Sequence, residues 1–354
     1  QLTRRQRQMC IRDSIYPHQM SISEKNKLID VRDLAVYFHI EQGIVKSVDG
    51  VSFSIDRGKS LGLVGESGCG KTITALSLLL LHPQPEGKIE RGNIFFYPEE
   101  GRPIDITKLG INSKDIRQRR GNDISMIFQE PMMSLNPVHT IGQQLIETIR
   151  LHQKVDKNTA NIIATEALER VRISAPKRRM KEYPFQLSGG MRQRVMIAIA
   201  LSCNPKLLIA DEPTTALDVT IEAEILNLIQ ELKSELNMSM LMITHDLGVI
   251  GEVTDEVAVM YVGKVVERTS TKKLFSEPLH PYTKALFKSR PRINSSERLS
   301  SIDGTVPSPY SQTKGCSFAP RCEVAMDICK NKSPELIDLG EHHVSCWKYN
   351  KEEI

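Results

Sequence analysis

Residues 65–72 read Gly65-Glu66-Ser67-Gly68-Cys69-Gly70-Lys71-Thr72 and fit the pattern G-x-x-x-x-G-K-[ST]. A short apolar run over 60–64 precedes them, and a helical pattern follows as far as about Leu81. A glycine-rich turn between a strand and a helix points backbone N–H groups at phosphate oxygens, and the helix N-terminus adds partial positive charge. The sequence therefore predicts a phosphate loop in which Lys71 reaches the β- and γ-phosphates and the Thr72 hydroxyl ligates Mg²⁺. A plain glycine turn is the alternative, which the strand and helix on either side disfavour.

The composition is that of an ordinary globular protein long enough for two or three structural units. The chain has 354 residues, of which 40% are apolar and 25% charged, and its net charge of +4 neither demands nor excludes nucleic acid. No stretch approaches the roughly 20 apolar residues of a membrane helix, and no secretory signal is convincing. We therefore expect the chain to stay in the cytoplasm.

The first residues look foreign to the rest of the chain. Residues 9–14 read Met-Cys-Ile-Arg-Asp-Ser, which resembles a translated sequencing adapter, and Met20 is a plausible start. We treat 1–19 as a non-native or disordered leader and leave it out of the fold prediction. A native basic tail is the alternative.

Two acidic residues follow a second apolar run, Leu208-Ile209-Ala210-Asp211-Glu212. Carboxylates at the carboxyl end of a parallel strand lie beside the crevice where ligands bind. Asp211 is suited to hold Mg²⁺, and Glu212 is suited to orient and deprotonate an attacking water. Acids at strand ends are common, so this signal depends on the phosphate loop that precedes it.

A second helix start carries small residues, in Leu187-Ser188-Gly189-Gly190-Met191-Arg192-Gln193-Arg194. Free N–H groups and a serine hydroxyl at such a start make another anion site, although Ser188 could be a simple helix cap. This segment resembles the signature motif of ABC ATPases. The resemblance implies a head-to-tail pair of subunits, with each ATP between the phosphate loop of one and Ser188, Gly189 and Gly190 of the other.

Four further residues match positions of the same family. Gln129 resembles the Q-loop glutamine, which contacts Mg²⁺ or water and senses a membrane partner. His245 resembles the switch histidine at the γ-phosphate, and Asp218 resembles the D-loop aspartate. Phe38 occupies the place of the aromatic ring that stacks on adenine, although a half-buried strand phenylalanine is an equally simple interpretation. The resemblance implies catalytic roles for Lys71, Gln129, Glu212 and His245.

Three tail segments narrow the resemblance to the oligopeptide and dipeptide importers, some of whose nickel-importing relatives share related tails. They are His280-Pro281-Tyr282-Thr283-Lys284-Ala285-Leu286, Gly304-Thr305-Val306-Pro307-Ser308-Pro309 and Gly315-Cys316-Ser317-Phe318-Ala319-Pro320-Arg321-Cys322. The resemblance implies a motor for peptide import, peripheral at the cytoplasmic face of the inner membrane. Its implied partners are a second ATPase subunit that is a paralogue, two transmembrane permease subunits and, indirectly, a substrate-binding protein. A nickel-import motor and a soluble ABC ATPase acting on DNA or ribosomes are the alternatives; the single cassette disfavours the latter.

Four cysteines near the end have the spacing C-x5-C-x6-C-x16-C and are Cys316, Cys322, Cys329 and Cys346. Four thiolates can hold a [4Fe–4S] cluster or a tetrahedral Zn²⁺. The C-x-x-C spacing usual for structural zinc is absent, which favours iron–sulfur. Free thiols in a small core are the third possibility.

Together these patterns predict an α/β fold, with a P-loop ABC-ATPase core, an antiparallel β lobe, a helical signature subdomain and an irregular C-terminal extension. Unalternating apolar runs at 207–210 and 240–243 indicate strands buried on both faces of a parallel sheet. We expect a nucleotide-binding domain over 20–275, with its helical subdomain at about 129–191. Frequent prolines after Pro278 mark the extension over 276–354.

Overall fold

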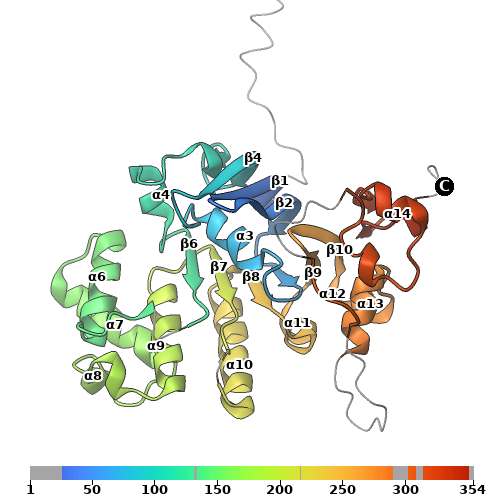
Figure 1. Cartoon of the computed structure of the whole chain (residues 1–354). Coiled ribbons are helices and arrows are strands. Elements are labelled where there is room, and N and C mark those ends of the chain that lie inside the picture. The colour runs from blue at the N-terminus through green and yellow to red at the C-terminus, as the bar shows by residue number, and fades with distance from the viewer. Residues whose placement is uncertain (1–25, 131–133, 216, 290–301, 308–313, 351–354) are drawn as a thin grey trace, which may run out of the picture.

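The computed structural model describes residues 26–130, 134–215, 217–289, 302–307 and 314–350. The predicted leader 1–19 lies outside these residues. The described chain has an α/β architecture in which a mixed sheet lies between an antiparallel β lobe and a layer of helices (Figure 1). The α/β fold predicted from the sequence is therefore confirmed.

The central sheet has eight strands in the order β11-β12-β10-β9-β3-β8-β7-β6. Five of them are mutually parallel: β3 (Ser60–Val64), β6 (Ile124–Ile127), β7 (Leu207–Asp211), β8 (Ser239–Thr244) and β9 (Glu256–Tyr261). Every residue of β3, β6, β7 and β8 is buried, which explains their unalternating apolar sequences.

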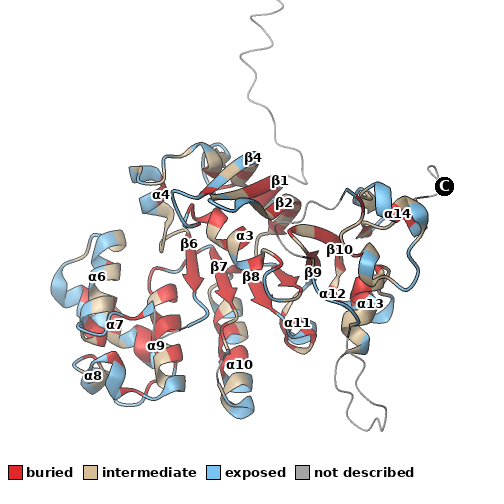
Figure 2. Ribbon diagram, in the orientation of Figure 1, coloured by how far each residue is buried: buried red, intermediate tan, exposed pale blue. Residues whose placement is uncertain are grey.

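Alternate residues of these strands enter two different cores, because successive side chains point to opposite faces of a sheet. Leu208 and Met240 pack with one core, whereas Ile209 and Leu241 pack with the other. The first core includes α9 (Gly189–Leu201), α10 (Val219–Glu235) and α11 (Leu247–Val253). The second includes α3 (Lys71–Leu78) and the β lobe. Figure 2 shows the buried residues concentrated on the strands and the helix faces that meet them.

The β lobe is a four-stranded sheet in the order β2-β1-β4-β5. Its strands are β1 (Lys27–Ile40), β2 (Gly43–Asp56), β4 (Gly87–Phe96) and β5 (Ile104–Asp105). Val51, Phe53 and Ile55 alternate inward along β2, as expected of a sheet with one covered face. The short elements η1 (Ile106–Lys108) and α4 (Lys114–Arg119) lead from this lobe to β6.

A group of helices stands to one side of the sheet, between β6 and β7 in the chain (Figure 1). It contains α6 (Ile141–Gln153), α7 (Lys157–Arg170), α8 (Pro176–Arg179) and η2 (Pro184–Gln186) before α9 begins. Thr140 starts α6 with a reciprocal capping box through Gln143, and Asp156 caps α7. These side-chain caps determine where the two helices begin.

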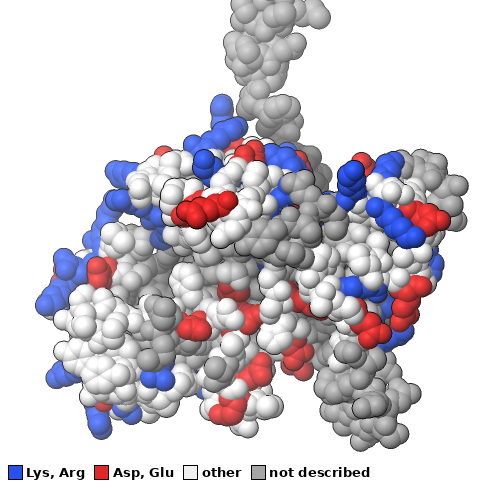
Figure 3. Space-filling model, in the orientation of Figure 1, with Lys and Arg blue, Asp and Glu red and all other residues white. Residues whose placement is uncertain are grey.

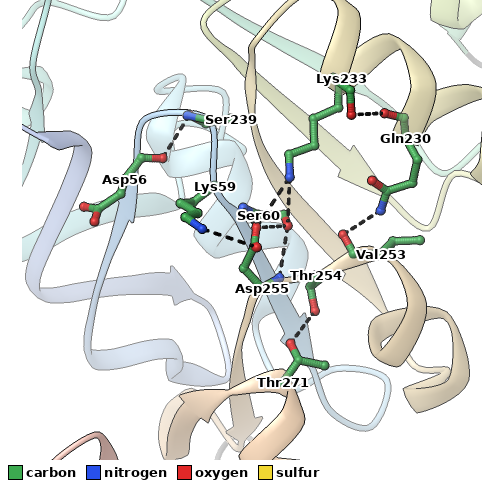
Figure 4. Close-up of polar contacts among 12 residues, drawn as sticks. Asp56, Lys59, Ser60, Gln230, Lys233, Ser239, Val253, Thr254, Asp255 and Thr271 are labelled. Carbon is green, nitrogen blue, oxygen red and sulfur yellow. Dashed lines mark hydrogen bonds and ion pairs between the residues drawn. The ribbon is translucent and has the colours of Figure 1, made fainter.

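A polar cluster joins the layers at the amino end of β3 (Figure 4). The Asp255 carboxylate accepts hydrogen bonds from the Ser60 backbone N–H at 2.8 Å and from its hydroxyl at 2.6 Å. Lys233 of α10 donates to the same carboxylate oxygen at 3.4 Å. Hydrogen bonding lowers the pKa of Asp255 even though its partial burial acts in the opposite direction. The cluster therefore ties α10 to the strands at the end of the sheet away from the phosphate loop.

The tail contains more regular structure than its sequence predicted. β10 (Lys264–Ser270) pairs with β9 and also with β12 (His342–Val344), and β12 pairs with β11 (Ile337–Asp338). The remaining short helices are α12 (Thr271–Ser276), α13 (Pro281–Lys288), η3 (Ala319–Arg321), α14 (Asp327–Asn331) and η4 (Trp347–Tyr349). The extension thus continues the central sheet.

A buried carboxylate fastens the extension to β10. Glu267 is fully buried, and its Oε1 lies 2.7 Å from His342 Nε2. The same carboxylate accepts the backbone N–H of Leu279 at 2.7 Å and that of His280 at 2.9 Å. Buried carboxylates require such partners, so these contacts connect β10, β12 and the start of α13.

The prediction of a [4Fe–4S] cluster on Cys316, Cys322, Cys329 and Cys346 is wrong. Within the described ranges, no group of three or more His, Cys, Asp or Glu side chains is placed to hold a metal ion. The four thiols line a cavity of about 20 Å³ together with Phe318 and Trp347, which is room for about one water molecule. Burial raises the pKa of Cys316 to about 11, so that residue is a neutral thiol at physiological pH.

Candidate active site

The phosphate loop lies between β3 and α3 and is pressed against neighbouring backbone. Gly70 has a φ of +99°, and a Cβ there would lie 2.1 Å from the carbonyl oxygen of Ser47. A Cβ on Gly65 would lie 2.2 Å from the carbonyl oxygen of Met260. Only glycine fits either position, so the loop can curl tightly enough to present its N–H groups to one ligand.

Lys71 closes this loop from within. Its side chain is buried, and Nζ donates to the carbonyl oxygens of Gly65 at 2.7 Å and Glu66 at 3.0 Å. The ammonium group is therefore held at the centre of the loop. A phosphate entering the loop can replace these carbonyls as its partner.

Asp211 ends β7 and carries a buried carboxylate with one unpartnered oxygen. The residue is 2% exposed, and its Oδ1 has no hydrogen-bond partner in the described structure. Burial raises the pKa of Asp211, and the Thr72 side chain hydrogen-bonds to the carboxylate. A buried carboxylate beside a hydroxyl group offers the oxygen ligands that Mg²⁺ prefers. The residues present therefore fit a magnesium ion.

Glu212 follows directly and is held by three side chains. Its Oε2 accepts from Gln129 Nε2 at 2.9 Å and from Thr215 Oγ1 at 3.0 Å. Its Oε1 lies 3.2 Å from His245 Nδ1. Gln129 comes after β6 and His245 after β8, so the carboxyl ends of neighbouring parallel strands bring these groups together.

The surroundings of Glu212 favour its ionised form. Partial burial acts to raise the pKa of the carboxyl, but hydrogen bonds from His245 and Thr215 outweigh it and lower the pKa. Glu212 also has a φ of +45°, in the left-handed region that non-glycine residues seldom adopt. An ionised, oriented carboxylate beside a phosphate loop can accept a proton from water.

The signature residues form a separate group with Asp218. Ser188 caps α9 by accepting the N–H of Met191, and Asp218 caps α10 by accepting the N–H of Ile221 at 3.0 Å. A Cβ on Gly190 would lie 3.1 Å from Ile221, so the starts of α9 and α10 are in contact. Each of these two caps makes its hydrogen bond within its own helix. Neither cap joins the hydrogen bonds that hold Lys71.

Phe38 lies on β1 of the antiparallel lobe, opposite Val45 and Gly87. Its half-buried ring is close enough to Gly87 that a Cβ there would lie 2.9 Å from it. The ring therefore packs closely against Gly87 of β4.

Sequence reasoning missed three residues that contact the site. Thr215 holds Glu212, and the hydroxyl of Tyr282 and the guanidinium of Arg321 both bond to Glu66 of the phosphate loop. Tyr282 and Arg321 each belong to a tail motif that the sequence singled out, which was the only available signal. Nothing in either motif indicated a contact with the phosphate loop.

Comparison with known proteins places this geometry in a family. Residues 48–215 match the family described as "ABC transporter", and residues 266–329 match "Oligopeptide/dipeptide transporter, C-terminal region". The chain is 50% identical to the oligopeptide transport ATP-binding protein AppD of Bacillus subtilis over 327 residues, 92% of this chain and 98% of AppD. The chain belongs to the peptide ABC transporter ATPases.

Other relatives agree with this membership. This ABC transporter ATPase is 46% identical to the dipeptide transport ATP-binding protein DppD of Bacillus subtilis over 323 residues, 91% of this chain and 94% of DppD. The dimeric ATP-binding cassette MJ0796, solved with ADP and Pi, shares its fold with a TM-score of 0.60 at 23% identity, covering 69% of this chain and 99% of that one. As an ABC transporter ATPase, the chain is an enzyme that hydrolyses ATP.

Proposed function

We propose that this subunit uses ATP hydrolysis at the loop 65–72 to drive the import of peptides. The observation that carries the proposal is the position of Glu212, which is held by Gln129, Thr215 and His245 beside Asp211 and the phosphate loop. The names of the relatives, which are peptide transport proteins, support the substrate class. They do not favour a nickel-import motor or a soluble ABC ATPase.

Each polar group has a defined part in the proposed reaction. The N–H groups of Gly68, Cys69 and Gly70 bind the phosphates, and Lys71 leaves its two carbonyls to bind the β- and γ-phosphates. Glu212 accepts a proton from the attacking water, and its contact with Gln129 keeps the carboxylate oriented. His245 binds the γ-phosphate as negative charge redistributes over it.

Magnesium would be held by Thr72 and Asp211, with Gln129 near it, and would neutralise charge on the phosphates. Gly65, Glu66 and Ser67 complete the loop, and Phe38 supplies an aromatic face for adenine.

The signature group acts on a second nucleotide in this proposal. Ser188, Gly189 and Gly190 would face the phosphate loop of a second ATPase subunit in a head-to-tail pair, with Asp218 at the shared boundary. The hydrogen bonds of the Ser188 and Asp218 caps do not join those around Lys71, which supports this arrangement. The dimeric state of the cassette MJ0796 supports it as well. We propose that the second subunit is a paralogue.

We propose that the pair works on two transmembrane permease subunits at the cytoplasmic face of the membrane, which receive peptides from a substrate-binding protein. No helix in the described ranges is long and apolar enough to span a membrane. Lys and Arg are interspersed with Asp and Glu over the face in Figure 3, although basic side chains gather near α4 and α6. Such a mixed surface does not suggest the broad basic field of a nucleic-acid partner.

The test of this proposal is Glu212→Gln, which keeps the shape of the side chain and removes its basicity. MgATP affinity should remain, whereas turnover in the complete transporter should fall by roughly 10²- to 10⁴-fold. Glu252→Gln, on the exposed side of α11, is the matched control and should retain turnover. Undiminished hydrolysis by Glu212→Gln would remove Glu212 from the proposed role.

A further inference from the structure

Two side chains of the C-terminal extension, Arg321 and Tyr282, bond to Glu66 of the phosphate loop. Arg321 Nη1 lies 2.8 Å from Glu66 Oε2, and Nη2 lies 3.1 Å from Glu66 Oε1. The hydroxyl of Tyr282 accepts the backbone N–H of Glu66 at 2.9 Å. Glu66 is thus fixed by a bidentate ion pair on its side chain and by a hydrogen bond on its backbone N–H.

Arg321 and Tyr282 are themselves held in place by neighbouring groups. The Arg321 side chain is only 4% exposed, and its remaining N–H groups donate to the carbonyls of Ile302 at 3.3 Å and Asp303 at 3.1 Å. Tyr282 is fully buried, with its ring 4.6 Å from that of Tyr261. The contact is therefore made by ordered groups, in contrast to a flexible surface pair.

The contacts on Glu66 also affect Lys71, the lysine proposed to bind phosphate. The N–H of Glu66 points to Tyr282, and the carbonyl of the same residue accepts Lys71 Nζ at 3.0 Å. The two ends of this one residue therefore link the extension to Lys71. A shift of Glu66 would move the carbonyl that holds the ammonium group in place.

The ion pair also compensates the negative charge of Glu66. Glu66 places a carboxylate, 27% exposed, on a loop that has to receive the negative phosphates of a nucleotide. Unpaired, this carboxylate would repel the ligand, and the guanidinium of Arg321 compensates its charge.

We propose that Arg321 and Tyr282 are positioning residues of the phosphate loop, through which the C-terminal extension sets the affinity of the site for MgATP. Neither side chain needs to touch the nucleotide for this effect. The inference rests on the proposed function, because it assumes that MgATP binds at residues 65–72.

The test measures the dissociation constant of MgATP for the full chain. Arg321→Ala should weaken binding roughly 5- to 10-fold, at the low end of couplings usually found between sites. Adding Glu66→Gln to that variant should recover most of the loss, because the uncompensated charge is then gone. Arg321→Lys keeps the charge but cannot form a bidentate pair. Its affinity for MgATP should therefore lie between those of wild type and Arg321→Ala.

Arg268→Ala is the matched control. Arg268 also makes an ion pair, with Glu256 at 2.9 Å, and two bonds to Ser54, but none to the phosphate loop. Its removal should leave MgATP affinity unchanged. Tyr282→Phe removes a single hydroxyl from an otherwise intact ring and should weaken binding about twofold to fivefold.

Two results would overturn the inference. One is an affinity within twofold of wild type for both Arg321→Ala and Tyr282→Phe. The other is a loss in Arg321→Ala that Glu66→Gln does not relieve, because a purely structural role of Arg321 would not depend on the charge of Glu66. The assumption that MgATP binds at residues 65–72 fails separately, if Lys71→Ala also leaves MgATP binding unchanged.

Discussion

His280 makes the stability of this protein depend on pH in a way that the structure defines. The residue is 1% exposed and caps α13, with its Nδ1 accepting the backbone N–H of Tyr282 at 3.1 Å. Protonation of Nδ1 would place two donors face to face in a buried site. Burial accordingly lowers the pKa of His280 to about 4 from its ordinary value of 6.5.

The sign and size of the effect follow from this shift. Between pH 6.5 and 4 the unfolded chain binds a proton on His280 that the folded chain excludes. The stabilisation is therefore fully present above pH 6.5 and is lost as the pH falls toward 4. It amounts to about 1 kcal/mol between pH 7.5 and 5.5, and to about 3 kcal/mol over the whole window.

Urea unfolding of wild type and His280→Asn at pH 7.5 and 5.5 measures this contribution. Asparagine can accept the same N–H and is a good helix cap, but it does not titrate. The free energy of unfolding should fall by about 1 kcal/mol less in the variant than in wild type. His139→Asn, at an exposed position, should retain the wild-type dependence. Equal pH dependence in wild type and His280→Asn would refute the reasoning.

Three further changes test other parts of the structure. Lys71→Ala should weaken MgATP binding at least roughly tenfold, because a charge-assisted bond to phosphate is lost, and unchanged affinity by titration calorimetry would contradict the phosphate-loop proposal. Asp211→Asn should raise the Mg²⁺ concentration needed for half-maximal ATPase activity, and an unaltered magnesium dependence would remove Asp211 as a ligand. Trp347→Ala should lower the free energy of unfolding by about 3–5 kcal/mol, because the residue is 1% exposed and donates to the Lys332 carbonyl at 2.8 Å. Circular dichroism has to follow this last variant, since Trp347 is the single tryptophan of the chain, and a loss under 1 kcal/mol would contradict the packing argument.

The core of the fold could be predicted because its sequence signals are local. Strands buried on both faces have unalternating apolar sequences. The phosphate loop requires Gly70 and Gly65 because a Cβ there would lie 2.1 and 2.2 Å from a backbone carbonyl oxygen. The convergence of Gln129, Glu212 and His245 follows from three strands that end at the same edge of a parallel sheet. Each of these features depends on a few consecutive residues.

The tail could not be predicted in the same way. β12 has three residues, too few to show a pattern, and it is held in the sheet by the contact of His342 with Glu267. The cysteine spacing suggested a metal site because spacing contains no information on the volume between the thiols. The cavity among them has room for about one water molecule and is lined also by Phe318 and Trp347.

The pairing of β12 with β10 also affects how the chain behaves when it is shortened. β10 is seven residues long, and without β12 its outer N–H and C=O groups would form an open edge onto which another chain could add a strand. At this edge of the described sheet the outermost strand is β11, which is only two residues long and is a poor template. The extension thus protects the ATPase core from self-association, and a fragment ending before His342 should aggregate even where its nucleotide site is intact.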